Sequence, residues 1–234
     1  MEDIPKISKG DIVHKVVKGG LSAIPFAGGL AAEFFDLVIK PPLSKRLDAW
    51  MESVIEGLKG LEEKVEGFKV EELSKNEMFI TTVMQATQTA IRNHQKEKLE
   101  ALRNAALNAA LPNAPEEDLQ MIFLGYIDSL TTWHIRILKL FDNPIEWFKQ
   151  NGKKFPELLF GGLENVLTSA YPELRGQRGF FDQIFKDLYE KGLINTESLH
   201  STMPGSGLTA QRTSDIGKTF IRFITSPLAD SDKP

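Results

Sequence analysis

The sequence contains no cysteine. Disulfide bonds, thiolate zinc sites, iron–sulfur clusters and cysteine nucleophiles are therefore excluded. Histidine is scarce as well, and the chain has only His14, His94, His134 and His200. No two of them stand at the spacing of a metal-binding motif, and none accompanies a catalytic serine motif. We therefore expect no metal, no cofactor and no catalytic residue, and an enzyme whose site leaves no linear motif is the alternative.

The chain also lacks an excess of charge of one sign. Its 234 residues carry 28 basic and 32 acidic side chains, which gives a formal net charge of −4. No third of the chain is basic, so the electrostatic footprint of a nucleic-acid-binding protein does not stand out. The uncharged run over residues 19–32 is shorter than the ~20 apolar residues that a membrane-spanning helix needs. We expect a cytoplasmic protein, with peripheral contact at the inner membrane as a further expectation.

Small residues recur along the segment 19–32, whose sequence is GGLSAIPFAGGLAA. Their spacing of three or four residues makes a stripe that permits close approach of a neighbouring helix. One interpretation is a segment that contacts a membrane or another copy of the chain, and the other is a tightly packed helix or hairpin inside a bundle. The residues that we single out for membrane contact or self-association share this small size: Gly20, Ala23, Ala27, Gly28 and Ala31.

The clearest periodicity lies in residues 43–68, where apolar residues alternate spacings of four and three. This pattern is typical of an amphipathic helix in a bundle. Helical patterns also cover 11–39, 74–111 and 116–130. We therefore predict an all-α bundle over residues 11–128. The members of the repeating pattern are Leu47, Met51, Val54, Leu58, Leu61, Val65 and Phe68.

From residue 129 onward the order of signals changes. Three helical patterns are followed by Leu193-Ile194, by a polar stretch that turns at residues 204–207, and by a closing helix. This order predicts a winged-helix-like module with a small β-hairpin over residues 129–226, followed by a flexible tail at 227–234. The core that we predict for the whole chain consists of Leu47, Trp50, Val54, Leu58, Leu61, Ile80, Ile122, Phe123, Ile135, Leu138, Phe181, Ile184, Leu188 and Phe220.

A winged helix suggests DNA as the partner, but the charges of the third helix oppose that interpretation. This helix carries Asp182, Asp187 and Glu190 against two lysines, and DNA phosphates repel such a face. Binding to nucleic acid is therefore the alternative, and contact with a protein partner is the preferred expectation. The basic residues that would contact nucleic acid lie elsewhere in the module: Arg175, Arg178, Arg212, Lys218 and Arg222.

Four stretches set the layout of the chain: GLSAIPFAGGLAAEFF, PPLSKRLDAW, LTTWHIRILKLFDNP and TSDIGKTFIRFI. In this order they resemble the Abi-alpha group, bacterial proteins linked to abortive infection by phage. The resemblance implies a helical protein of antiviral defence or cell stress, with no active-site residue to carry over. We therefore expect a non-enzymatic defence or stress protein that acts through protein or membrane contacts. The alternative is a winged-helix transcriptional regulator that binds DNA.

Overall fold

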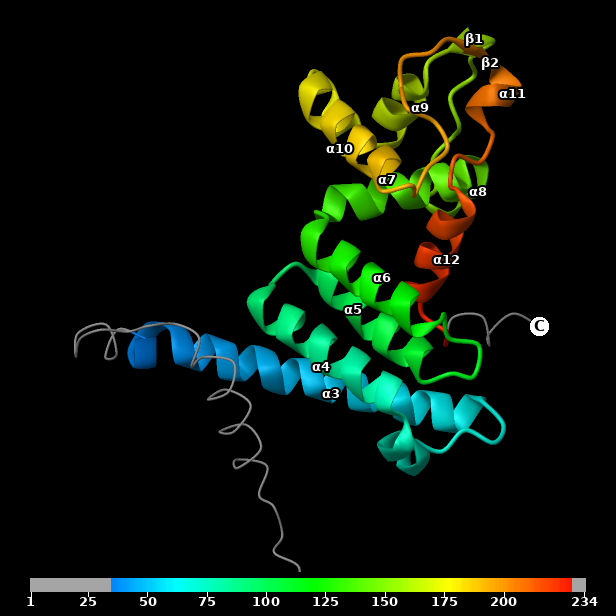
Figure 1. Cartoon of the computed structure of the whole chain (residues 1–234). Helices are drawn as coiled ribbons and strands as arrows, with labels where there is room; N and C mark the ends of the chain where they lie inside the picture. The colour runs from blue at the N-terminus through cyan, green and yellow to red at the C-terminus, as the bar shows by residue number, and fades with distance from the viewer. Residues whose placement is uncertain (1–34, 229–234) are drawn as a thin grey trace, which may run out of the picture. The chain divides into compact units, whose positions relative to one another are not determined.

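The computed structural model describes residues 35–228. It is mainly helical with a small two-stranded antiparallel sheet, which confirms the predicted helical class (Figure 1). The chain divides into two compact units, of which the first has described residues 35–114 and 226–228, and the second is 115–225. The segment 19–32 and most of the predicted tail lie outside the described residues, and so do Gly20, Ala23, Ala27, Gly28 and Ala31.

The first unit packs three α-helices against one another. The helices meet closely because Gly57 of α3 is buried against α5, where an added Cβ would lie 2.7 Å from Cδ1 of Leu107. The Trp50 indole N–H donates a hydrogen bond of 2.9 Å to Oγ1 of Thr87 and so ties α3 to α4. The elements of this unit are η1 (Phe35–Ile39), α3 (Lys40–Lys64), η2 (Val70–Lys75), α4 (Glu77–Arg92) and α5 (Lys96–Ala109).

Helix boundaries in the first unit differ from the predicted ones. The periodic helix ends at Lys64, so Val65 and Phe68 lie beyond α3. The helix predicted over 74–111 is two helices that are separated at residues 93–95. The first of them is capped by Asn76, whose Oδ1 accepts a hydrogen bond of 3.0 Å from the Phe79 N–H. The periodicity therefore located the helices, whereas their ends depend on local caps that it does not encode.

The second unit is assembled around an aromatic core. The Phe123 ring of the first helix of the unit lies 5.3 Å from the Phe220 ring and 5.7 Å from the Phe223 ring of the last. Residues 117–128 belong to the second unit, whereas we predicted them in the N-terminal bundle. The elements are α6 (Glu117–Ser129), α7 (Thr132–Asp142), α8 (Pro144–Gln150), β1 (Phe160–Gly161), α9 (Leu163–Ala170), η3 (Pro172–Leu174), α10 (Arg178–Glu190), β2 (Met203–Pro204), α11 (Gly205–Leu208) and α12 (Asp215–Phe223).

All but two of the residues that we predicted to form the core are buried in the structure. Ile80 is half-buried and Ile122 is 46% exposed, while the other twelve residues are buried. Both exceptions belong to amphipathic helices with broad apolar faces, and the edge of such a face is left to solvent.

The glycine-rich stretch 204–207 does not form the predicted hairpin turn. Pro204 is part of β2, and residues 205–208 form the short helix α11. β2 pairs with β1, which precedes α9, in the register Phe160↔Pro204 and Gly161↔Met203. An added Cβ at Gly205 would lie 2.8 Å from the Leu158 carbonyl oxygen. This glycine therefore permits close approach of two backbones rather than a turn.

We predict that Gly217→Ala strongly destabilises the protein. The backbone of Gly217 in α12 packs so tightly that an added Cβ would lie 2.0 Å from the Leu193 carbonyl oxygen. Displacing this backbone is expected to lower the free energy of unfolding by about 3 kcal/mol. Gly125→Ala is the control, because Gly125 is exposed within α6 and its added Cβ meets nothing within 4 Å. Urea unfolding should show a gain of about 1 kcal/mol for this control, and equal stability of the two variants would contradict the packing described.

Candidate functional site

Three consecutive aliphatic side chains are exposed where η1 passes into α3. Leu37 is 80% exposed, Val38 45% and Ile39 37%. Pro41 and Pro42, which follow within the first turn of α3, are exposed as well. Contiguous apolar surface of this kind marks a contact site more often than isolated exposed residues do. We call residues 37–42 the apolar entry of α3.

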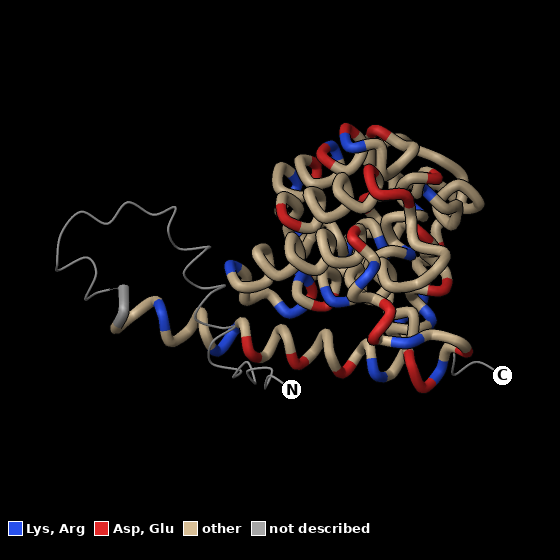
Figure 2. Tube along the Cα trace, turned by 60° about the horizontal axis from the view of Figure 1, so that its bottom comes forward, with Lys and Arg blue, Asp and Glu red and all other residues tan. Residues whose placement is uncertain are grey.

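The charged residues that follow Ile39 are at first positive, whereas Asp36 directly precedes Leu37. The side chains from Leu37 to Leu47 include Lys40, Lys45 and Arg46, and the first carboxylate in α3 is that of Asp48. Figure 2 shows this order as basic positions at the start of α3 and acidic positions farther along it. No helix among residues 35–228 is long and apolar enough to cross a membrane.

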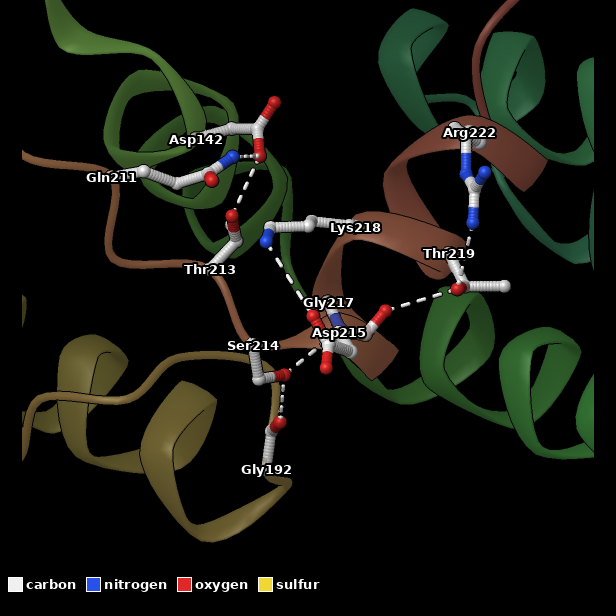
Figure 3. Close-up of polar contacts among 10 residues, drawn as sticks. All are labelled: Asp142, Gly192, Gln211, Thr213, Ser214, Asp215, Gly217, Lys218, Thr219 and Arg222. Carbon is white, nitrogen blue, oxygen red and sulfur yellow. Dashed lines mark hydrogen bonds and ion pairs between the residues drawn. The ribbon is translucent and has the colours of Figure 1, made fainter.

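The structure separates the five basic residues that we predicted to contact nucleic acid. Arg175 and Arg178 lie at the turn before α10 and at its first position, and both are exposed. Lys218 and Arg222 belong to α12, which lies apart from the start of α10 (Figure 1). The latter two already have neighbours on their own helix: Lys218 pairs with Asp215 at 3.4 Å, and Arg222 donates to Oγ1 of Thr219 at 3.1 Å (Figure 3).

Arg212 points into the loop that carries it. Its Nη2 donates to the Gly207 carbonyl oxygen and approaches Sδ of Met203 at 3.1 Å. The side chain is half-buried, and its Nε atom is buried. The structure therefore uses Arg212 to hold the 203–212 loop together, which differs from its predicted place on a nucleic-acid surface.

A polar joint at the end of α7 fixes the chain that leads into α12. Asp142 Oδ1 accepts hydrogen bonds from Nε2 of Gln211 at 2.9 Å and from Oγ1 of Thr213 at 2.6 Å (Figure 3). Ser214 Oγ donates to the Gly192 carbonyl oxygen at 2.5 Å and accepts from the Gly217 N–H at 3.0 Å. These contacts are structural. Periodicity does not predict the contacts of Asp142, because their partners are 69 and 71 residues away along the chain.

Two of the three acidic side chains of α10 are engaged by histidines. Asp182 Oδ1 lies 2.7 Å from Nε2 of His200, and Asp187 Oδ2 lies 3.2 Å from Nε2 of His134. The other Asp187 oxygen accepts from Nε2 of Gln183 at 2.6 Å. Asp182 and Asp187 are thus each held by neighbouring side chains, while the exposed Glu190 pairs with Lys186 at 3.6 Å.

The His134–Asp187 contact borders a shallow pocket of about 370 Å³. Its lining also includes Ser129, Glu190 and Lys191. His134 Nδ1 accepts from the Thr131 N–H at 3.1 Å, which closes a capping box at the start of α7. The histidine thus has a structural task at the start of α7. Within residues 35–228, no group of three or more histidine and carboxylate side chains is placed to hold a metal ion.

Aromatic rings and a cation meet at the junction of α7, α8 and η3. The Tyr171 ring lies 5.2 Å from that of Trp133 and 5.1 Å from that of Trp147. The Arg136 guanidinium lies 5.1 Å from the Trp133 ring centre. Burial raises the pKa of Tyr171 to about 12, an effect that Glu173 reinforces and that Arg136 opposes.

We predict a specific alkaline weakness from Tyr171. Its folded pKa of about 12 exceeds the ordinary value of 10.0, so the stability linked to its neutral phenol is present below pH 10.0 and is lost as pH rises toward about 12. Tyr171→Phe has no phenol to ionise, so its free energy of unfolding should fall less over this pH interval. Urea unfolding of both proteins at several pH values in that interval measures the difference. If both lose the same free energy of unfolding as pH rises, Tyr171 is not shielded from solvent.

No protein-family model matches this chain, and no match is found among curated proteins or solved structures. The function is therefore proposed from the residues and geometry given above.

Proposed function

We propose that the chain is a non-enzymatic protein that acts through contacts of residues 19–40, and that its partner is the surface of an anionic membrane. The exposed run Leu37-Val38-Ile39, with basic residues directly after it, carries this proposal. The resemblance to the Abi-alpha group adds the setting of phage defence or cell stress.

The apolar entry combines the two features that favour a lipid surface. Each aliphatic side chain that leaves water contributes up to about 2 kcal/mol. Each basic residue near an anionic surface adds about 1 kcal/mol. Lys40 directly follows the three aliphatic residues and Lys45 is exposed farther along α3. No carboxylate follows them until Asp48, whereas Asp36 directly precedes them. Peripheral binding of an amphipathic helix to anionic lipid depends on this combination.

A protein partner, including a second copy of the chain, would also bury the aliphatic residues. Binding to such a partner needs no lipid. It would therefore be the same whether anionic or neutral vesicles are present. Sensitivity to lipid charge therefore separates the two kinds of partner.

We predict that the full chain co-sediments with anionic vesicles and that Leu37→Asp weakens this binding about ten-fold or more, because it places a carboxylate in the apolar entry. Leu159→Asp is the matched control, since Leu159 is 86% exposed but belongs to the second unit. Ala27→Asp extends the test to the segment 19–32.

The Leu159→Asp control should bind anionic vesicles as strongly as the unchanged protein does. The unchanged protein should bind neutral vesicles less than anionic ones. Absence of binding to anionic vesicles, or equal binding by Leu37→Asp, would overturn the membrane proposal. Retained self-association or capture of a partner through residues 37–39 would then identify a protein contact instead.

A second candidate function is DNA binding by a winged-helix-like module. It is favoured by the order of α7, β1, α9 and α10, followed by an isolated β-bridge between Ile194 and Thr213 at the base of the next loop. The carboxylates of Asp182 and Asp187 on α10 are each in hydrogen-bond contact with a histidine. Arg175 and Arg178, exposed at the start of α10, would contact phosphates.

This candidate predicts salt-sensitive binding of duplex DNA. Combined Arg175→Ala and Arg178→Ala exchanges should weaken it about ten-fold, because each removes a cation from the start of α10. Lys218→Ala on α12 is the control and should bind normally. An electrophoretic shift assay at low salt measures the effect, and no shift there would remove DNA binding from consideration.

A further inference from the structure

His200 lies between two carboxylates that come from different helices. Its Nδ1 is 2.5 Å from Oε2 of Glu164 in α9, and its Nε2 is 2.7 Å from Oδ1 of Asp182 in α10. An ionised carboxylate only accepts hydrogen bonds, and a neutral imidazole has a single N–H to donate. Both contacts are hydrogen bonds only when both ring nitrogens carry a proton. The geometry is therefore that of a positively charged ring shared by two anions.

His134 provides a comparison within the same unit. Its Nδ1 accepts a backbone N–H from Thr131, so the ring proton is on Nε2, which faces Asp187. A neutral ring satisfies both of these contacts. The requirement for a second ring proton is therefore specific to the surroundings of His200.

We propose that His200 is a proton-dependent clamp that holds residues 195–204 against α9 and α10, and that loss of one ring proton releases this segment. The clamp is complete at low pH. It is lost once the pH is high enough to remove one of the two ring protons.

Release follows from the charges that surround the ring. When the ring loses a proton, one nitrogen lone pair faces a carboxylate oxygen, and Glu164 and Asp182 lose the cation between them. Arg178 of α10 approaches the other oxygen of Asp182 at 3.4 Å. Arg178 cannot replace the clamp, because it starts the same helix as Asp182 and does not belong to the loop.

The clamp fastens a segment that has few regular backbone contacts. β2, which ends this segment, is two residues long and pairs only through Phe160↔Pro204 and Gly161↔Met203. Next to His200, the Leu199 carbonyl oxygen accepts from the Glu164 N–H at 3.1 Å. Leu199 itself is buried, so release of the segment would bring an apolar side chain toward solvent.

Amide hydrogen exchange of the full chain tests the clamp. After correction for the intrinsic effect of pH, protection of residues 195–204 should fall about ten-fold or more between about pH 5.5 and about pH 8, since a charge-assisted hydrogen bond is lost. His200→Gln should give the low protection at both pH values. His134→Gln is the matched control and should keep the pH dependence of this segment.

Glu164→Gln gives the sharpest outcome. The new carboxamide can donate to Nδ1, so a neutral ring can accept from it and still donate from Nε2 to Asp182. Protection in this variant should therefore stay high at about pH 8. Equal protection at both pH values in the unchanged protein, or continued pH dependence in folded Glu164→Gln, would overturn the proposal.

If Glu164→Gln does not fold, a measurement on the unchanged protein still tests the proposal. The ¹⁵N chemical shifts of the His200 ring report whether each nitrogen is protonated. The clamp requires both nitrogens to be protonated at about pH 5.5, and a neutral ring there would overturn it.

Discussion

The second unit depends on the hydrogen bond between Asp142 and Thr213. It joins the end of α7 to a strand-like segment that is more than seventy residues later in the chain, at a distance of 2.6 Å. Around it, the Arg212 N–H donates to the Phe141 carbonyl oxygen, the Asn195 N–H donates to that of Arg212, and Thr213 bridges to Ile194. Because Thr213 is buried, the hydrogen bond that its hydroxyl donates to the Asp142 carboxylate removes the cost of an unsatisfied polar group. The helix α12 then starts in the position where Phe220 reaches the aromatic core.

Local patterns in the sequence were sufficient to find most of the helices and the greater part of the core. The spacing of Leu47, Trp50 and Val54 encodes a buried helix face wherever that helix packs, so it could be read without knowing the partner. The pairing of β1 with β2 could not be found in this way, because it joins two-residue strands that are about forty residues apart. The assignment of α6 failed for a related reason: an amphipathic pattern says that a face is buried and does not say against which helix.

The same distinction applies to the candidate sites. Arg212 was counted with the basic residues because charge is visible in a sequence, whereas its contacts with Gly207 and Met203 are visible only in space. Glu164, Asp182 and His200 have no common linear spacing typical of a site, and they meet only because a loop returns to two helices. In contrast, the apolar character of residues 19–32 is evident from composition, and a second apolar run, Leu37 to Ile39, lies in the described part of the chain.

The two-residue length of β1 has a consequence for how the protein behaves when it is concentrated. Within the described chain, β1 has β2 on one side and no strand on the other. Its Phe160 side chain and the neighbouring Leu159 are 70% and 86% exposed. Natural sheets usually protect such an edge with charge, proline or a covering loop, and here proline stands on β2 instead. Because β1 is only two residues long, it offers a foreign strand few backbone groups to pair with, so its short length protects this edge despite the exposed Leu159 and Phe160.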